Sequence, residues 1–104
     1  MDEMSILCVS NHYIQQFYFN PDYATLPKQV QDELRAMCVL FTEEVGGILI
    51  VRYDENGSLC LVTEAAEEDI MFDEIGAGLK IKQLREEKRE LFESLEMFYR
   101  VFVG

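Results

Sequence analysis

The sequence predicts an α+β fold in which an antiparallel sheet of three or four strands carries its helices on one face. Three patterns support this prediction. A β-branched run with a turn signal predicts a hairpin over residues 47–53 and 58–64, a helical pattern precedes it at 27–44, and a longer one follows at about 67–103. A chain of 104 residues is long enough to bury a core, so we expect a single α+β domain over residues 1–104.

The N-terminal part contains two short candidate strands. Residues 6–9 form an apolar run, and residues 13–19 are rich in aromatic side chains with some alternation, which favours strands joined by a turn at Ser10-Asn11-His12. A helix over residues 11–19 is the alternative that this pattern leaves open. The sequence Asn20-Pro21-Asp22 is typical of a turn and ends either element.

The first helix is predicted over residues 27–44. Proline is tolerated in a first helical turn, and Gly46-Gly47 supplies the residues that end a helix with a positive φ. One face repeats apolar residues at helical spacing, and these are Val30, Leu34, Met37, Cys38 and Phe41. This stripe is broad, so we expect the helix to lie flat on the sheet.

The hairpin is the clearest local pattern. Residues 48–53 are β-branched and aromatic, Asn56-Gly57 is the preferred two-residue hairpin turn, and residues 59–63 return. The continuous apolar run at 48–51 indicates a strand that is covered on both faces, or at least central in the sheet.

The last third of the chain reads as one long helix. Unbroken from Asp69 to Val103, it would span roughly 50 Å, whereas a compact chain of this length has a radius of gyration of about 13 Å. The helix therefore either breaks or projects towards a partner, and the sequence leaves its continuity open. Two glycines in Gly76-Ala77-Gly78 cost roughly 1–2 kcal/mol against alanine, so we expect a bend at 76–78.

The same segment predicts a dimer interface. Apolar residues recur at intervals of three and four positions, with Lys88 in the one slot that breaks the pattern. The predicted interface residues are Ile81, Leu84, Leu91, Leu95, Phe98 and Phe102. This spacing is typical of a helix that packs lengthwise against another helix, so we expect a homodimer.

Charge excludes several partners. Residues 1–79 carry 15 acidic side chains against three basic ones, a net −12, whereas residues 80–104 have a net charge of +1. Such an acidic body repels nucleic-acid backbones and acidic membrane surfaces. No apolar run approaches the ~18 residues that cross a bilayer. Because Met1-Asp2-Glu3 is acidic where a secretory signal is basic, we expect a cytoplasmic protein.

No residue set has the spacing of a catalytic, metal or cofactor site. The three cysteines Cys8, Cys38 and Cys60 lie far apart in apolar surroundings and are expected to be buried thiols. His12 is the only histidine, and no paired ligand spacing accompanies it. Acidic residues gather before the last helix, namely Glu64, Glu67, Glu68, Asp69 and Asp73, and are expected to be solvated acids at a helix start.

Several segments resemble a family of small uncharacterised proteins from Gram-positive anaerobic bacteria. They are Phe19-Asn20-Pro21 with Leu26-Pro27, the run Cys38-Val39-Leu40-Phe41-Thr42-Glu43-Glu44-Val45-Gly46-Gly47, Asp73-Glu74-Ile75-Gly76 with Leu79-Lys80-Ile81-Lys82, and Glu90-Leu91-Phe92. The resemblance covers nearly the whole chain and implies a free-standing bacterial protein with no assigned activity. The order of elements is similar to that of deaminases and JAB-type metalloproteases, but their metal-ligand motifs are absent from the sequence.

Two hypotheses of function follow. The first is a non-catalytic assembly or regulatory module that forms homodimers through its C-terminal helix. The second is a small-ligand-binding protein or enzyme with a pocket between the sheet and the helices. The candidate polar groups for that pocket are His12, Tyr13, Tyr18 and Tyr23.

Overall fold

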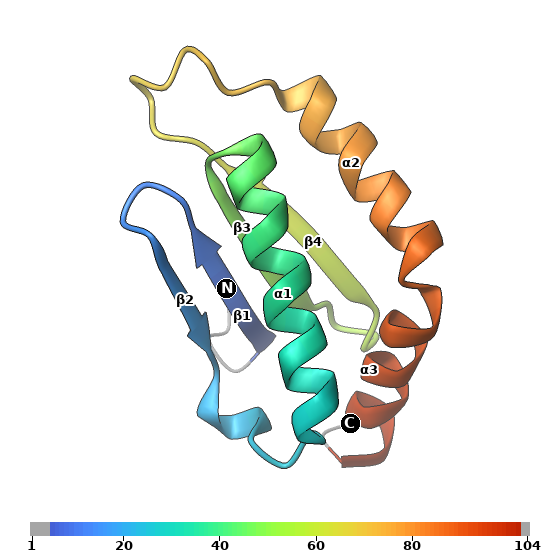
Figure 1. Ribbon diagram of the computed structural model, residues 1–104. Helices are drawn as coiled ribbons and strands as arrows, with labels where there is room; N and C mark the ends of the chain where they lie inside the picture. The colour runs from blue at the N-terminus through green and yellow to red at the C-terminus, as the bar shows by residue number, and fades with distance from the viewer. Residues whose placement is uncertain (1–4, 103–104) are drawn as a thin grey trace.

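The protein is described by a computed structural model that covers residues 5–102. Its elements, in chain order, are β1 (Ile6–Asn11), β2 (Gln16–Phe19), the 3₁₀ helix η2 (Pro21–Tyr23), α1 (Lys28–Val45), β3 (Ile48–Tyr53), β4 (Leu59–Glu64), α2 (Glu74–Glu87) and α3 (Arg89–Phe102) (Figure 1). The radius of gyration is 13.4 Å and the extents are 41 × 26 × 25 Å.

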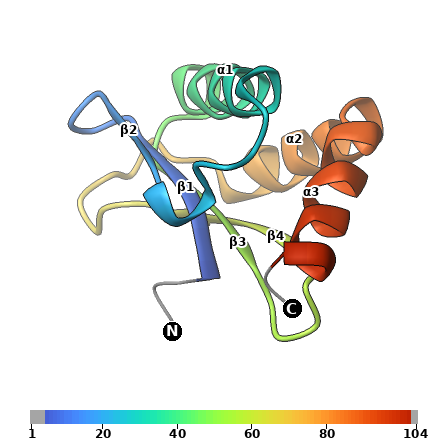
Figure 2. The same ribbon diagram turned by 90° about the horizontal axis from the view of Figure 1, so that it is seen from below.

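The four strands form one antiparallel sheet in the order β2-β1-β3-β4. Figure 2 shows α1, α2 and α3 on one side of this sheet, with no described element on the other side. The predicted α+β class, the four-stranded antiparallel sheet and the placement of the helices on one face are therefore confirmed.

The N-terminal segment forms a β-hairpin. Strands β1 and β2 pair from Cys8 with Phe19 to Asn11 with Gln16, so the helix considered for residues 11–19 is wrong. The turn lies at residues 12–15, two residues later than expected, because Asn11 still pairs within the ladder. Gln15 closes this turn with a φ of 54°.

Helix α1 follows the predicted range closely. It starts after Pro27, whose fixed φ suits a helix start, and ends at Gly46, which has a φ of 82°. Its buried face is made by Leu34, Met37, Cys38, Phe41 and Thr42, which lie over β1 and β3.

The β3–β4 hairpin is confirmed, but its turn is longer than the predicted two-residue turn. Asp54 and Ser58 close the loop through Asp54 N–H and the Ser58 carbonyl at 2.9 Å, and the Gly57 N–H donates to the Asp54 carbonyl at 3.0 Å. Gly57 has a φ of 80°, whereas Asn56 has a negative φ. A two-residue type I′ turn needs a positive φ at both of its central residues, so residues 55–57 form a three-residue loop instead.

Strand β3 is central in the sheet, which is one of the two arrangements that the sequence predicted. It is covered on one face only. Leu49, Val51 and Tyr53 are fully buried under the helices, whereas Ile48 and Ile50 on the other face are only half-buried. The apolar run at 48–51 is therefore not explained by helices on both faces of the sheet within one chain.

The predicted helix over 67–103 is wrong in its start and in the position of its bend. Residues 65–73 form a loop, and α2 begins after Asp73, whose side chain accepts hydrogen bonds from the N–H groups of Ile75 and Gly76. The chain changes direction at Lys88, where φ is −110° and ψ is 27°, and not at residues 76–78. Lys88 is the residue that broke the apolar pattern, so the sequence did mark this position.

The core lies between the sheet and the three helices. The side chains of Tyr23, Tyr53 and Phe41 are the largest fully buried ones. The Tyr53 hydroxyl donates to the carbonyl of Leu95 at 2.8 Å, which fixes α3 against β3. Burial, followed by the nearby Tyr23, raises the pKa of Tyr53 well above its usual range.

Adjacent glycines allow a matched prediction. Gly46 and Gly47 have φ values of 82° and 70°, and the ψ of −168° places Gly46 in a region that is essentially restricted to glycine, so alanine at either position costs on the order of 1–3 kcal/mol of backbone strain. A Cβ at Gly47 would also lie 2.7 Å from the Glu64 carbonyl oxygen and 2.7 Å from Phe72, whereas one at Gly46 meets nothing within 4 Å. We expect Gly47→Ala to lower the free energy of unfolding by about 1–3 kcal/mol more than Gly46→Ala in urea titrations. Equal losses would contradict the close packing at Gly47.

Tyr53 predicts how stability depends on pH. In the unfolded chain a tyrosine loses its proton near pH 10, whereas the folded chain holds the Tyr53 proton to higher pH. The unfolded state then binds fewer protons, so the stabilising contribution is complete below pH 10 and is lost as the pH rises above it. Tyr53→Phe should lose about 1 kcal/mol at neutral pH and show a shallower alkaline decline in urea titrations. An unchanged alkaline slope would contradict this assignment.

Candidate interaction surfaces

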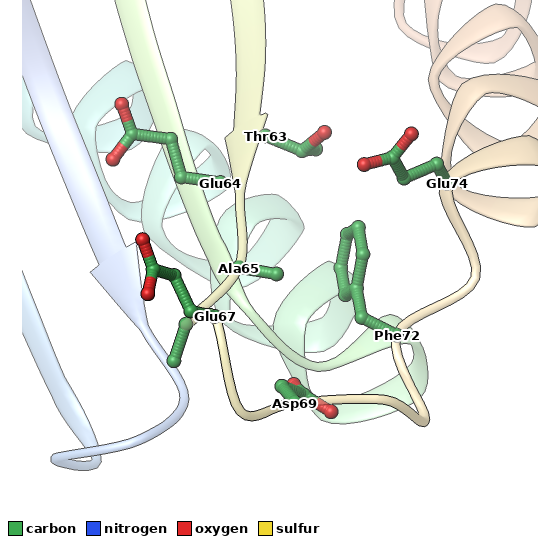
Figure 3. A pocket seen from close by; sticks show the side chains of 8 residues that line it. Thr63, Glu64, Ala65, Glu67, Asp69, Phe72 and Glu74 are labelled. Atoms are coloured by element: carbon green, nitrogen blue, oxygen red, sulfur yellow. The ribbon is translucent and has the colours of Figure 1, made fainter.

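A wide opening at one end of the sheet is acidic, and its carboxylates do not converge. It has a volume of about 700 Å³ between the end of β4, the 65–73 loop and the start of α2, and its lining includes Glu64, Glu67, Asp69, Phe72 and Glu74. Figure 3 shows Phe72 and Glu74 pointing into the space between β4 and α2, while Glu64 and Glu67 point away from it. Among the described residues, no three His, Cys, Asp or Glu side chains lie close enough to hold a metal ion.

The 65–73 loop is tied to the β1–β2 turn by Tyr13. The Tyr13 hydroxyl donates to Asp69 Oδ2 at 2.5 Å and accepts from the Ala66 N–H at 3.0 Å. The Asp69 carboxylate raises the pKa of Tyr13, because it accepts a hydrogen bond from the protonated hydroxyl. Tyr13 thus holds two loops together, which sequence reasoning missed because 56 residues separate the partners.

The four polar groups considered for a ligand pocket lie in different places. Tyr23 is buried against Tyr53, Tyr18 is exposed on the uncovered sheet face, and His12 and Tyr13 lie on the β1–β2 turn. A small cavity of about 140 Å³ does lie beside His12, between the β1–β2 hairpin and α1. This cavity is smaller than the roughly 300 Å³ or more of typical ligand pockets.

The polar groups between the sheet and α1 satisfy one another. Ser10 Oγ and Thr42 Oγ1 lie 2.8 Å apart, and both residues are buried. Cys8 Sγ and Cys38 Sγ lie 3.8 Å apart in the core, and the Cys38 thiol, together with burial, raises the pKa of Cys8. A buried thiol with a raised pKa is a poor nucleophile. Cys60 departs from the prediction, because it is only partly buried, on β4.

A groove of about 250 Å³ separates α1 from α2. Its apolar wall includes Met37, Leu40 and Leu84. Two ion pairs join the helices across it, Lys80 to Glu44 at 3.0 Å and Lys88 to Glu33 at 3.3 Å.

The predicted dimer interface is largely used inside the chain. Leu84, Leu91 and Leu95 are buried in the core, and Ile81 and Phe98 pack against it. Phe102 is the exposed member of the set, and its ring lies 4.9 Å from that of Phe98. The change of direction at Lys88 brings these residues onto the sheet, so most of the predicted interface is covered within the chain.

The outer surface of α2 also carries exposed apolar residues. We define this surface by Ile75, Gly78, Leu79 and Lys82. Successive helical residues are about 100° apart, so Ile75 and Leu79 lie opposite the buried Ala77. Their exposed fractions are 79% and 65%. Figure 1 shows α2 at the margin of the molecule, with no other described element beyond it.

The two glycines of α2 differ in what surrounds them. A Cβ at Gly76 would lie 2.5 Å from Asp73 Oδ2, so glycine leaves room for the side chain that caps the helix. A Cβ at Gly78 would meet nothing within 4 Å. Gly78 therefore weakens α2 without an evident packing reason inside the described chain.

None of the helices in residues 5–102 is both long and apolar enough to cross a lipid bilayer.

The chain is a member of a protein family without an assigned activity. The model of the family of unknown function DUF6145 matches residues 4–104, so the chain belongs to that family. No curated protein and no solved structure matches the chain. The predicted resemblance to a family of uncharacterised proteins is confirmed at this level.

The link through Tyr13 gives a prediction about the 65–73 loop. Tyr13→Phe removes the acceptor of the Ala66 N–H and the donor to Asp69 while keeping the ring. We expect faster hydrogen exchange at Ala66, measured by NMR, with unchanged exchange in α1. Tyr18→Phe is the control, because Tyr18 is also exposed. Unchanged exchange at Ala66 would show that the loop is held by other contacts.

Proposed function

We propose that this chain is a non-catalytic assembly or regulatory module of the bacterial cytoplasm that forms homodimers through its C-terminal helices. We place the dimer contact on the outer surface of α2, because most of the predicted interface residues lie in the core. One observation carries the proposal, namely the two opposite apolar sides of α2. Ala77 and Leu84 face the core, whereas Ile75 and Leu79 face solvent. A helix that is apolar on opposite sides is typical of one that is covered on both.

Gly78 supports a close contact at the same place. It is a neighbour of Ile75 on the helix surface, three residues further along, and it costs about 1 kcal/mol relative to alanine in a helix interior. Glycine is favoured where another backbone approaches closely. Two α2 helices that cross at Gly78 explain why a residue with open space around it has no side chain.

Charge also favours two antiparallel copies of α2. A two-fold axis at Gly78 places Glu74 of each copy opposite Lys82 of the other, since both lie four residues from Gly78. The ion pairs among the described residues leave Glu74 and Lys82 unused. Residues 80–104 carry a net charge of +1, so this part of the chain adds little to the repulsion between two acidic bodies.

The proposal predicts that a charge at position 79 disrupts assembly. Leu79→Glu should lower the mass measured by sedimentation at about 100 µM, a concentration at which micromolar complexes are largely formed. Met97→Glu is the matched control, because Met97 is another exposed apolar residue, on α3. A monomeric wild-type protein, or equal masses for wild type and Leu79→Glu, would contradict the α2 contact.

Gly78→Ala separates folding from assembly. Because a Cβ at this position meets nothing within 4 Å in the chain, the substitution should raise the free energy of unfolding of the monomer by about 1 kcal/mol. It should also weaken the dimer, because the added methyl group lies between the two helices. A more stable chain with unchanged self-association would argue against Gly78 as the contact point.

A further inference from the structure

The uncovered face of the sheet is apolar at its centre. Side chains alternate between the two faces of a strand, so the residues paired with Ile48, Ile50 and Arg52 lie on this face. Its half-buried apolar residues are Ile6, Val9, Ile48, Ile50 and Val62. An antiparallel sheet with one face in water normally shows polar residues there. We call this surface the open sheet face.

Two opposite charges lie at the two ends of the open sheet face. Arg52 is paired with Cys60 at one end, and Glu64 is paired with Ile48 at the other. Four residues along the strands separate these positions, which corresponds to about 13 Å. Within the chain the two charges are too far apart to pair.

Arg52 has hydrogen-bonding capacity left over. Its Nε is buried without a partner, and one terminal nitrogen reaches its neighbouring Tyr53 carbonyl at 3.4 Å. Glu64 is exposed and takes part in none of the ion pairs of residues 5–102. Buried guanidinium groups are usually paired with an acceptor, so this end of the face has an unused donor.

We propose that the open sheet face binds the same face of a second copy of the chain. A two-fold axis across the strands turns one sheet over the other and exchanges the ends of the strands. Arg52 of each copy then lies opposite Glu64 of the other, and the apolar residues meet at the centre. Packed sheets lie about 10 Å apart, a gap that the long arginine and glutamate side chains can span.

Charge complementarity selects a second copy as the occupant. The face carries one positive and one negative charge at opposite ends, so it complements itself after a two-fold rotation. A uniformly basic partner would meet Arg52 unfavourably, and a uniformly acidic one would meet Glu64 unfavourably. The contact is independent of the α2 contact and lies on another face of the molecule. A chain with both contacts assembles beyond a dimer.

Charge reversal tests the contact, and Leu79→Glu is included in every chain to remove the α2 contact. This background protein should be a dimer. Adding Arg52→Glu places two carboxylates opposite each other across the contact, and adding Glu64→Arg places two guanidinium groups opposite each other. Each change should therefore raise the dissociation constant at least about tenfold. An equal mixture of the two variants restores both opposite-charge pairs, so it should form a heterodimer, seen by native mass spectrometry and sedimentation.

The outcomes separate the two contacts. A monomeric background protein, or a mixture that associates no better than its components, overturns the sheet contact. An unchanged mass for Leu79→Glu relative to wild type overturns the α2 contact instead. Circular dichroism checks the fold of each variant. If Arg52→Glu does not fold, the background protein is compared with Glu64→Gln and Glu64→Arg at the exposed position. Glu64→Gln should weaken the dimer less than Glu64→Arg, and equal affinities for all three overturn the contact.

Discussion

The hydrogen bond from Tyr53 to the Leu95 carbonyl marks the constraint on which the C-terminal half depends. It joins the central strand β3 to the last helix, and it forms only because the chain turns at Lys88. Straight continuation of α2 would carry residues 89–102 past the end of the sheet. The turn instead brings Leu91, Phe92 and Leu95 onto the core, where their burial outweighs the lost helical geometry at one residue.

Packing all three helices on one face leaves apolar surface on the second face of the sheet and on the outer side of α2, among other places. The sheet receives no described cover on its second face, and α2 lies at the edge of the helix layer (Figure 2). Isolated apolar residues on a surface are ordinary, but grouped ones are typical of contact sites. On α2 the exposed apolar residues lie near Gly78, which has open space around it. On the open sheet face they lie between the opposite charges of Arg52 and Glu64. These features carry the two contacts proposed above.

The polar groups of the interior are paired with one another. Ser10 with Thr42 and Cys8 with Cys38 pair inside the core, and Tyr13 binds Asp69 and Ala66 at the surface. Each pair uses its groups to hold elements that are far apart in sequence. The acidic opening beside Phe72 offers carboxylates that point in different directions (Figure 3). The paired groups of the core and of the Tyr13 link thus stabilise the fold.

The sequence by itself determined the class of the fold, because local periodicity and turn chemistry set the elements. Helix 27–44 and the hairpin over 47–53 and 58–64 follow from patterns within a few residues of each other. The pattern of residues 11–19 left a strand and a helix open, and only the pairing of β1 with β2 excludes the helix. Only the tertiary structure decided where the last helix turns and which apolar residues stay outside. The apolar residues from Ile81 to Phe98 have the same spacing whether they contact a partner or the core of their own chain. Periodicity indicates that a helix face is covered, but it does not indicate what covers it. The break at Lys88 settles that choice for Leu84, Leu91 and Leu95. The open sheet face likewise depends on the register between β1, β3 and β4, which brings Arg52 and Glu64 to one face from positions 12 residues apart.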